Sequence, residues 1–266
     1  MRARITGTGS YVPEKVLTNQ DFEKYLDTTD EWIVARTGIR ERHIAAEGEN
    51  TSDLCVLAAR NAIDMAGIKA EDVDLIIVAT ITGDYPWPAT ACIVQDKIGA
   101  KQCGAYDISA ACSGFIYALN NAVAQIESGA IQRALVIGAE TLSRIVDYDD
   151  RNTCLLFGDA AGAVVLEAGE GERGILSSHL HSDGSYFELL GQPAFGTAIT
   201  PTEEIVRDRG YFLTMQGNEV FKVAVKMLAE VAQEAVEANG MTVNDIDLLI
   251  PHQANIRILE ATAKRM

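Results

Sequence analysis

Long apolar runs, paired cysteines and clustered metal ligands are missing from this chain of 266 residues. No apolar run approaches the ~20 residues that cross a bilayer, and no apolar signal stretch follows the basic start MRAR. The five cysteines form no CxxC pair and no Cys/His cluster with metal-ligand spacing. We therefore expect a cytoplasmic protein with no disulfide framework, no membrane segment and no metal.

Basic residues are in the minority. The chain has 22 Lys and Arg against 38 Asp and Glu, which gives a net charge of −16. This excess of negative charge argues against nucleic acid as a partner, and an acidic protein partner would need a local basic patch. Apolar residues make up 48% of the chain, so a sizeable core is available in one large domain or two ordinary ones.

One segment recurs 173 residues later in the chain. Residues 62–80, AIDMAGIKAEDVDLIIVAT, and residues 235–253, AVEANGMTVNDIDLLIPHQ, each read as a helix end, a Gly stop, an Asp-apolar-Asp turn and an apolar strand. The recurrence predicts two related halves, residues 1–173 and 174–266. At this offset the second half is expected to be incomplete at its C-terminus.

Apolar runs alternate with helical patterns along the chain. The runs are 74–80 (DLIIVAT), 133–140 (RALVIGAE), 161–168 (AGAVVLEA) and 247–253 (DLLIPHQ). Such continuous runs suit strands that are buried on both faces. Helical patterns over 51–67 and 113–129 lie between them. The alternation predicts an α/β fold with a largely parallel sheet in each half.

Cys112 is a candidate nucleophile. It lies in DISAACSGF, residues 107–115, between a predicted strand end and a predicted helix. Free backbone N–H groups and the positive end of the helix dipole are expected to lower the pKa of a thiol at this point. Small neighbouring residues leave room for a substrate. The residues alone leave open a second interpretation, a small cysteine buried in a tight strand–helix junction.

Of the four histidines, His252 has the most informative position. It follows the predicted strand that ends in DLLIP, and open α/β sheets carry functional groups at the carboxyl ends of their strands. A purely structural histidine stays possible here. His43 is expected at the surface, and His179 and His181 lie in a predicted strand.

Five motifs follow one another along the chain in a specific order. They are TTDEWIVARTGIRERHIA (28–45), DISAACSGF (107–115), FGDAAGAVVLE (157–167), GNEVFKVAV (217–225) and PHQANIRI (251–258). In this combination the chain resembles β-ketoacyl-acyl carrier protein synthase III of the thiolase superfamily. The resemblance implies duplicated α/β halves in a five-layered αβαβα arrangement, which agrees with the internal repeat.

The resemblance also implies a reaction that needs no cofactor. Cys112 would take an acyl group from acyl-CoA as a thioester, and malonyl-acyl carrier protein would lose carbon dioxide and attack that thioester, which initiates type II fatty-acid synthesis. His252 would donate a hydrogen bond to the malonyl thioester oxygen, and the Cys112 N–H would stabilise the oxyanion of acyl transfer. The family's third catalytic residue, an Asn, has no counterpart within these 266 residues, because Asn255 belongs to a different motif.

Further residues match the substrate-binding positions of that family. Trp32 and Arg36 are one helical turn apart and are expected to share a face. The resemblance implies that Trp32 and Arg151 hold the adenine of CoA between them, with Thr28 as a neighbouring contact. It also implies a homodimer in which Trp87 closes the partner's acyl pocket. The remaining matches are Phe221 and Asn255 for the pantetheine arm, and Leu142, Phe157, Leu189 and Leu213 for the acyl pocket.

A local basic patch is predicted near the end of the chain. Arg257 and Lys264 are seven residues apart and share a face of a predicted helix, with Arg265 beside them and Lys222 in a neighbouring motif. This patch is a candidate docking site for the acidic carrier protein. An ordinary solvated helix face is the alternative.

Other functions stay open at this point. Within the superfamily the chain could be a thiolase, a hydroxymethylglutaryl-CoA synthase or a starter condensing enzyme of secondary metabolism. Outside it, a Cys-His thioester hydrolase would release the acyl group to water. A non-catalytic protein that binds acyl groups or a carrier is the third class.

Overall fold

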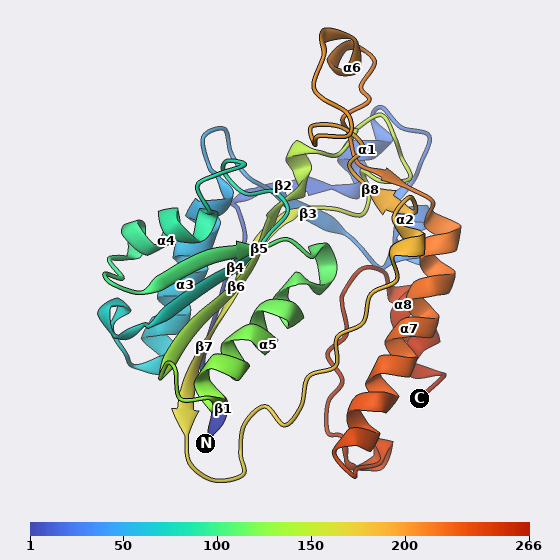
Figure 1. Cartoon of the computed structure of the whole chain (residues 1–266). Coiled ribbons are helices and arrows are strands. Elements are labelled where there is room, and N and C mark those ends of the chain that lie inside the picture. The colour runs from blue at the N-terminus through green and yellow to red at the C-terminus, as the bar shows by residue number, and fades with distance from the viewer. The chain divides into compact units, whose positions relative to one another are not determined.

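The computed structural model describes residues 1–266, and the chain forms two compact units (Figure 1). Unit 1 contains residues 1–15, 43–141 and 158–180, and unit 2 contains residues 16–42, 142–157 and 181–266. Each unit therefore combines segments that lie far apart in the sequence. The division into duplicated halves, 1–173 and 174–266, concerns the repeat in the sequence and stays a prediction.

Unit 1 is built on a five-stranded sheet with the strand order β1-β7-β6-β4-β5. The strands are β1 (Arg2–Tyr11), β4 (Leu75–Ala79), β5 (Gly104–Ile108), β6 (Arg133–Thr141) and β7 (Asp159–Gly169). β4 pairs in parallel with β5 and β6, whereas β7 pairs antiparallel with β1 and β6. The prediction of a largely parallel sheet is therefore wrong, because the sheet is mixed. Parallel neighbours need a crossover, usually a helix, and the chain between β6 and β7 lays no α-helix on this sheet.

Helices cover both faces of this sheet (Figure 1). α3 (Thr51–Ala66) and α4 (Thr90–Ile98) lie on one face, and α5 (Gly114–Glu127) lies on the other. Ile76 and Val78 of β4 pack towards α3 and α4, whereas Ile77 and Ala79 pack towards α5. Every residue of β4 is buried. This two-sided burial explains why the strand reads as a continuous apolar run.

Two glycines let α3 lie directly on the first strand. A Cβ atom at Gly7 would overlap the carbonyl oxygen of Ala62, and one at Gly9 would overlap that of Ala58. The helix residues at these contacts are alanines, so neither partner keeps the backbones apart. Glycine in a strand marks such a close approach, and larger residues at Gly7 or Gly9 would push α3 away from the sheet.

Unit 2 is built from shorter elements. Its helices are α1 (Asn19–Glu23), α2 (Asp30–Thr37), α6 (Glu203–Arg207), α7 (Gly217–Ala238) and α8 (Ile256–Ala263). β8 (Leu190–Gly191) pairs with β9 (Thr214–Met215), and β2 (Lys15–Thr18) pairs with β3 (Glu41–Ile44). One core cluster of unit 2 joins its first two segments through Phe22, Ile33, Val146, Cys154 and Leu155. Single 3-10 turns complete the chain as η1 (Ala70–Asp72), η2 (Ala111–Ser113), η3 (Leu142–Arg144), η4 (Gly184–Tyr186) and η5 (Val243–Asp245).

The internal repeat is confirmed in local structure. α3 and α7 are each followed by a left-handed glycine, Gly67 with φ 69° and Gly240 with φ 66°. A 3-10 turn follows in both copies, η1 and η5. Asp72 accepts a hydrogen bond from the backbone N–H of Lys69 at 2.8 Å, and Asp245 accepts one from Thr242 at 2.8 Å. The two copies therefore share the same helix stop and the same capped turn.

The strand predicted over 247–253 is wrong. Its counterpart in the first half is β4, but residues 247–253 form no strand in unit 2. Leu248 is 73% exposed and Ile250 is 78% exposed. A strand needs neighbours that satisfy its backbone groups, and no strand of the described chain lies beside this segment. Residues 247–253 therefore keep the apolar character of β4 without pairing with a strand.

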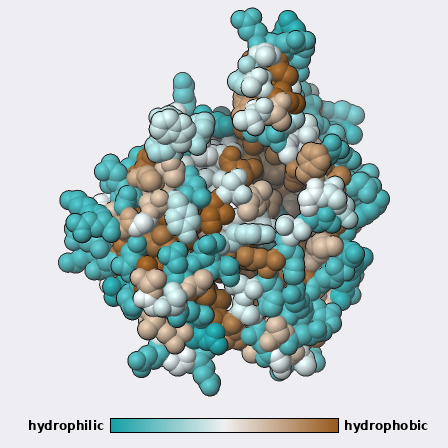
Figure 2. Space-filling model, viewed as in Figure 1, coloured by the Kyte–Doolittle hydropathy of each residue, from teal (hydrophilic) through white to brown (hydrophobic).

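The surface and the helices give two further findings. Hydrophilic side chains cover most of the face seen in Figure 2, with apolar patches between them. None of the helices combines the length and the apolar character needed to span a membrane. No group of three or more His, Cys, Asp and Glu side chains is arranged to hold a metal ion.

Candidate active site

Cys112 lies in the turn that joins the sheet of unit 1 to α5. β5 ends at Ile108, and the 3-10 turn η2 runs into α5, which begins at Gly114. Ala111 has a φ of 45°, which places an alanine in the left-handed region directly before the cysteine. A Cβ atom at Gly114 would come within 3.1 Å of the Ala79 Cβ. Glycine therefore lets the start of α5 sit tightly on β4, and Cys112 is held at the helix N-terminus as the sequence predicts.

The predicted lowering of the Cys112 pKa is wrong. Although the residue is exposed, protein atoms packed around the thiol desolvate its charged form and raise its pKa. The negative charge of Glu140 raises it further, and the local backbone N–H lowers it by less. Burial and the charge of Glu140 thus outweigh the local backbone N–H in setting the direction of the Cys112 pKa shift.

Glu140, which the sequence reasoning missed, anchors the turn beside the nucleophile. It lies near the end of β6, and its carboxylate accepts hydrogen bonds from the backbone N–H of Ile81 at 2.9 Å and of Thr82 at 3.1 Å. The hydroxyls of Thr80 and Thr82 also donate to it. Burial raises the pKa of Glu140 and outweighs these hydrogen bonds. An acidic residue at the carboxyl end of the apolar run 133–140 was the available sequence signal.

Replacing Glu140 by Gln is expected to make Cys112 react at lower pH. The thiolate forms only above the pKa of the thiol, and removal of the neighbouring negative charge lowers that pKa. The measurement is the rate of Cys112 alkylation by iodoacetamide as a function of pH, followed by intact mass. Glu167→Gln is the control, because Glu167 pairs with Arg133 at the far end of the same strand pair. An unshifted profile for Glu140→Gln would show that its charge does not reach the thiol.

His252 lies in unit 2, in the irregular segment between η5 and α8. Packing around the imidazole disfavours its charged form and lowers its pKa. A neutral imidazole keeps one N–H donor. His252 therefore suits a hydrogen-bond donor that carries no positive charge near pH 7.

Trp32 is flanked by two arginines of unit 2. The Arg36 Cζ lies 4.5 Å from the centre of the indole and the Arg151 Cζ lies 5.1 Å from it. The predicted common face of Trp32 and Arg36 is confirmed. Arg151 donates to the carbonyl of Asp27 and lies 3.6 Å from its carboxylate. We call Trp32, Arg36 and Arg151 the Trp–Arg cluster, in which positive charge gathers within an acidic protein.

Thr28 is close to this cluster in sequence and has an unusual hydroxyl. Its Oγ1 is buried and has no hydrogen-bond partner within the described chain. A buried polar atom without a partner is costly.

The residues matched to the pantetheine arm have structural roles as well. Asn255 caps α8, and its side-chain oxygen accepts from the Arg257 N–H at 2.8 Å. The Arg257 Cζ lies 5.6 Å from the centre of the Phe221 ring, so α7 and α8 bring these two residues together. Lys222 pairs with Glu219 at 2.7 Å, which offsets its charge. Lys264 and Arg265 are exposed at the end of α8.

The residues matched to the acyl pocket all lie in unit 2. Leu213 is buried, and its N–H donates to the carbonyl of Ile145 at 2.8 Å, next to η3. The carbonyl of Leu189 accepts from the Gln216 N–H at 2.8 Å. Leu142 and Phe157 are half-buried. Hydrogen bonds thus join the 142–145 and 213–216 segments with Leu189.

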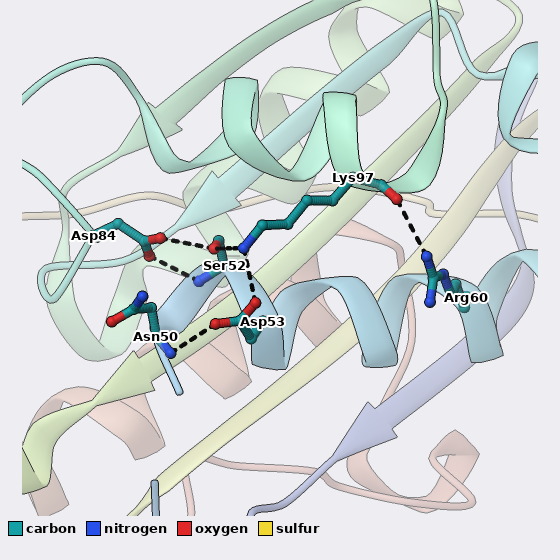
Figure 3. A network of polar contacts seen from close by, with 6 residues as sticks. All are labelled: Asn50, Ser52, Asp53, Arg60, Asp84 and Lys97. Carbon is teal, nitrogen blue, oxygen red and sulfur yellow. Dashed lines mark hydrogen bonds and ion pairs between the residues drawn. The ribbon is translucent and has the colours of Figure 1, made fainter. Parts of the chain in front are cut away.

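Trp87 projects from a turn of unit 1 whose base is fixed. The side chain is 83% exposed. Asp84, in the same turn, accepts from the Ser52 N–H at 2.8 Å and from the Ser52 hydroxyl at 2.7 Å (Figure 3). Lys97 bridges the Ser52 hydroxyl at 2.8 Å and Asp53 at 2.7 Å. This network joins the turn to the start of α3 and to α4. The exposed Trp87 side chain therefore projects from a turn whose base is held by hydrogen bonds.

Comparison with known proteins decides the family. The model of the 3-oxoacyl-[acyl-carrier-protein (ACP)] synthase III family matches residues 106–184, and the model of its C-terminal part matches residues 236–266. The chain is 56% identical over 264 residues to the β-ketoacyl-[acyl-carrier-protein] synthase III of Xanthomonas campestris pv. campestris strain 8004, an alignment that covers 99% of this chain and 80% of the relative. The chain belongs to the β-ketoacyl-acyl carrier protein synthase III family.

Solved structures agree with the assignment to synthase III. The 3-oxoacyl-[acyl-carrier-protein] synthase III from Aquifex aeolicus VF5 superposes with a TM-score of 0.91 at 47% identity, over 99% of this chain and 80% of that chain. The enzyme from Pseudomonas aeruginosa PAO1 gives 0.91 at 40% identity, over 100% of this chain and 80% of that chain. The predicted thiolase-like fold class is confirmed, and so is the prediction of an acyl-transferring condensing enzyme.

Proposed function

We propose that this synthase III condenses an acyl-CoA primer with malonyl-acyl carrier protein through an acyl-Cys112 intermediate. The observation that carries the proposal is the place of Cys112 in the turn before α5, within the segment that the family model matches. Cys112 sulfur attacks the thioester carbonyl, and the carbon–sulfur bond to CoA breaks. Free CoA leaves with the thiol proton, which gives a short primer attached to the enzyme.

Condensation follows on the loaded enzyme. The malonyl group loses carbon dioxide, and the electron pair left behind forms an enolate of the carrier thioester. Its carbon attacks the carbonyl of acyl-Cys112, and the cysteine sulfur leaves with the electron pair of the broken bond. The sulfur then takes a proton from solvent, which restores the thiol. His252 donates its N–H to the developing enolate oxygen, a role that its lowered pKa supports. The Cys112 N–H stabilises the oxyanion of acyl transfer.

No cofactor is needed for these steps, because thioester exchange and decarboxylation supply both the electrophile and the carbanion. The Trp–Arg cluster binds the adenine and phosphates of CoA by stacking and charge, with Thr28 beside it. Phe221 and Asn255 contact the pantetheine arm, and the acyl chain lies among Leu142, Phe157, Leu189 and Leu213. We place the reaction in the cytoplasm, a reducing compartment that suits five free cysteines.

The test is product formation from acetyl-CoA with and without malonyl-acyl carrier protein. A condensing enzyme forms β-ketoacyl-acyl carrier protein only when both substrates are present, and it releases carbon dioxide in equal amount. A Cys-His hydrolase would release acetate without the carrier, and a binding protein would form no acyl-cysteine. Either of these results would reject the proposal. Malonyl-CoA as an equally good acceptor would reject the carrier requirement.

Reversing Arg257 and Lys264 to Glu is expected to weaken use of the carrier about tenfold or more in kcat/KM, because charge complementarity drives such docking. Acetylation of Cys112 by acetyl-CoA is expected to be unchanged. Arg207→Glu is the control, because it reverses an exposed basic residue of α6 that pairs with Asp208. Equal losses in loading and carrier use would contradict a docking role for this patch.

Replacing Trp87 by Ala is expected to widen the range of primers. In the proposed homodimer Trp87 closes the acyl pocket of the partner, so its removal makes room for longer chains. The measurement is the ratio of kcat/KM for octanoyl-CoA to that for acetyl-CoA, which should rise about tenfold or more if two buried methylene contacts are relieved. Tyr85→Ala is the control, since Tyr85 is a second exposed aromatic residue of the same turn. An unchanged ratio would exclude Trp87 from the pocket.

A further inference from the structure

Arg42 is a buried cation whose partners carry no charge. It lies on β3 and is 3% exposed. Its Nε donates to the carbonyl of Leu155 at 2.9 Å, its Nη2 donates to the same carbonyl, and its Nη1 donates to the side-chain oxygen of Asn19. The Phe22 ring lies under the guanidinium at 5.0 Å. A buried charge without a counter-ion is costly, so the fold keeps Arg42 at the expense of stability.

The charge of Arg42 is retained despite this burial. Desolvation lowers its pKa to about 10, and the neighbouring Cys154, Tyr148 and Tyr25 raise it by less. Arg42 is therefore protonated at neutral pH and uses three of its N–H groups as donors. All of these contacts lie in unit 2.

One side of Arg42 is linked to the helix that carries Trp32 and Arg36. Asn19, which accepts from Arg42, donates to the carboxylate of Asp30 at 2.7 Å and to the carbonyl of Ile39 at 2.9 Å. Asp30 is the first residue of α2 and Ile39 follows its end. Arg42 thus holds both ends of α2 through a single amide.

The other side of Arg42 is linked to the turn that carries Arg151. Leu155, whose carbonyl accepts both bonds, lies in a tight series of turns in which the Cys154 N–H donates to the Asp150 carbonyl at 3.0 Å. The Asp150 carboxylate accepts from the Asn152 N–H at 3.0 Å in the same turns. Arg151 lies inside this series of turns. The hydrogen bonds from Arg42 to Leu155 therefore fix the position of the Arg151 backbone.

We propose that Arg42 is a positioning residue for the nucleotide end of acyl-CoA, because it holds the turn of Arg151 and the helix of Trp32 and Arg36 in one arrangement. The two arms of the Trp–Arg cluster come from segments more than a hundred residues apart, and Arg42 joins them. This inference rests on the proposed function, in which that cluster binds CoA. Its consequence is selective: loss of Arg42 weakens recognition of the nucleotide and spares the chemistry of Cys112, which lies in unit 1.

The experiment compares two acetyl donors that differ only at the nucleotide end. Acetyl-CoA carries the adenine and phosphates, whereas the short donor, S-acetylpantetheine, keeps the acetyl thioester and the pantetheine arm and lacks the nucleotide. The rate constant for acetylation of Cys112 is measured by intact mass for each donor. For Arg42→Met the acetyl-CoA rate constant is expected to fall about tenfold or more, as befits loss of the aromatic–cation contact that places Arg151 opposite Trp32. The rate constant for the short donor is expected to stay within about twofold, since Cys112 belongs to unit 1 and the hydrogen bonds of Arg42 lie within unit 2.

Two more variants make the result interpretable. Arg42→Lys keeps the charge but has no planar fork, so it should recover part of the acetyl-CoA rate. Asp30→Asn weakens the outer link and leaves Arg42 in place, and it should show a smaller loss with the same donor selectivity. Arg133→Met is the matched control, because it removes a partly buried arginine from unit 1, and it should change neither rate.

Three outcomes would overturn the inference. Equal losses for both donors in Arg42→Met would give Arg42 a general structural role, and unchanged acetyl-CoA rates in Arg42→Met and Asp30→Asn would give it none in binding. A wild-type protein that does not prefer acetyl-CoA to the short donor would overturn the proposed CoA site together with the role of Arg42. The first two results leave the proposed function standing.

Discussion

Replacing Cys112 by Ser is expected to abolish acyl loading. A serine hydroxyl is a far weaker nucleophile than a cysteine thiol when no base has deprotonated it, and removal of a catalytic nucleophile costs roughly a thousandfold or more. Intact mass after incubation with acetyl-CoA should show an acetyl adduct on the wild-type protein and none on Cys112→Ser. This is the largest effect that we expect from any single substitution in the chain.

A second cysteine supplies the control for that result. Cys92 is exposed on α4, within a helix of unit 1, and its thiol contacts the carbonyl of Ala105 at 3.6 Å. Cys92→Ser removes an accessible thiol that lies in the first turn of α4, outside the DISAACSGF segment, so the acetyl adduct should persist. An adduct that survives in Cys112→Ser and disappears in Cys92→Ser would move the nucleophile to α4 and reject the proposed mechanism.

Replacing His252 by Ala is expected to separate the two half-reactions. Loss of one donor to a developing oxyanion costs roughly a hundredfold to a thousandfold, so carbon dioxide release from malonyl-acyl carrier protein on the pre-acetylated enzyme should fall by that factor. Acetylation of Cys112 should change little, because the proposed contact of His252 is with the malonyl thioester. His181→Ala is the control, since His181 is an exposed histidine of unit 2 that binds Glu234.

The pH dependence of that step follows from the pKa of His252. Burial lowers this pKa, so the neutral imidazole persists below the pH at which an ordinary histidine becomes charged. Condensation on the acetylated enzyme should therefore continue at pH values below the usual histidine pKa of about 6.5 and decline only at lower pH. A decline centred at or above the ordinary value would contradict a neutral donor.

Local patterns predicted the local structure well. The start of α5 directly after the Cys112 turn, the helix stops at Gly67 and Gly240 and the capped turns after them all depend on a few neighbouring residues. The shared face of Trp32 and Arg36 is also set by one helical turn. Family motifs then supplied the reaction, which spacing alone left open.

Features that depend on contacts between residues far apart in the chain could not be predicted from the sequence. The run at 247–253 repeats the apolar character of β4, but a strand also needs neighbours, and pairing is not encoded in the run itself. Glu140 belongs to none of the five motifs, and Arg42 lies inside the first motif without a role that the motif predicts. Their roles arise from contacts with Thr82 and Leu155 across 58 and 113 residues. The pKa of Cys112 was misjudged for the same reason, because burial and Glu140 act on it from outside its own turn.

The strand order of unit 1 also sets the timing of assembly during synthesis. β1 is an edge strand whose single neighbour in the sheet is β7, and the first pairing joins Tyr11 to Ala161. A ribosome that adds 5–20 residues per second leaves β1 waiting for roughly eight to thirty seconds before its partner exists. During that interval Gly7 and Gly9, which contact α3 in the folded protein, belong to a strand without a partner. The first segment of the protein to be made is thus among the last to be locked into the sheet.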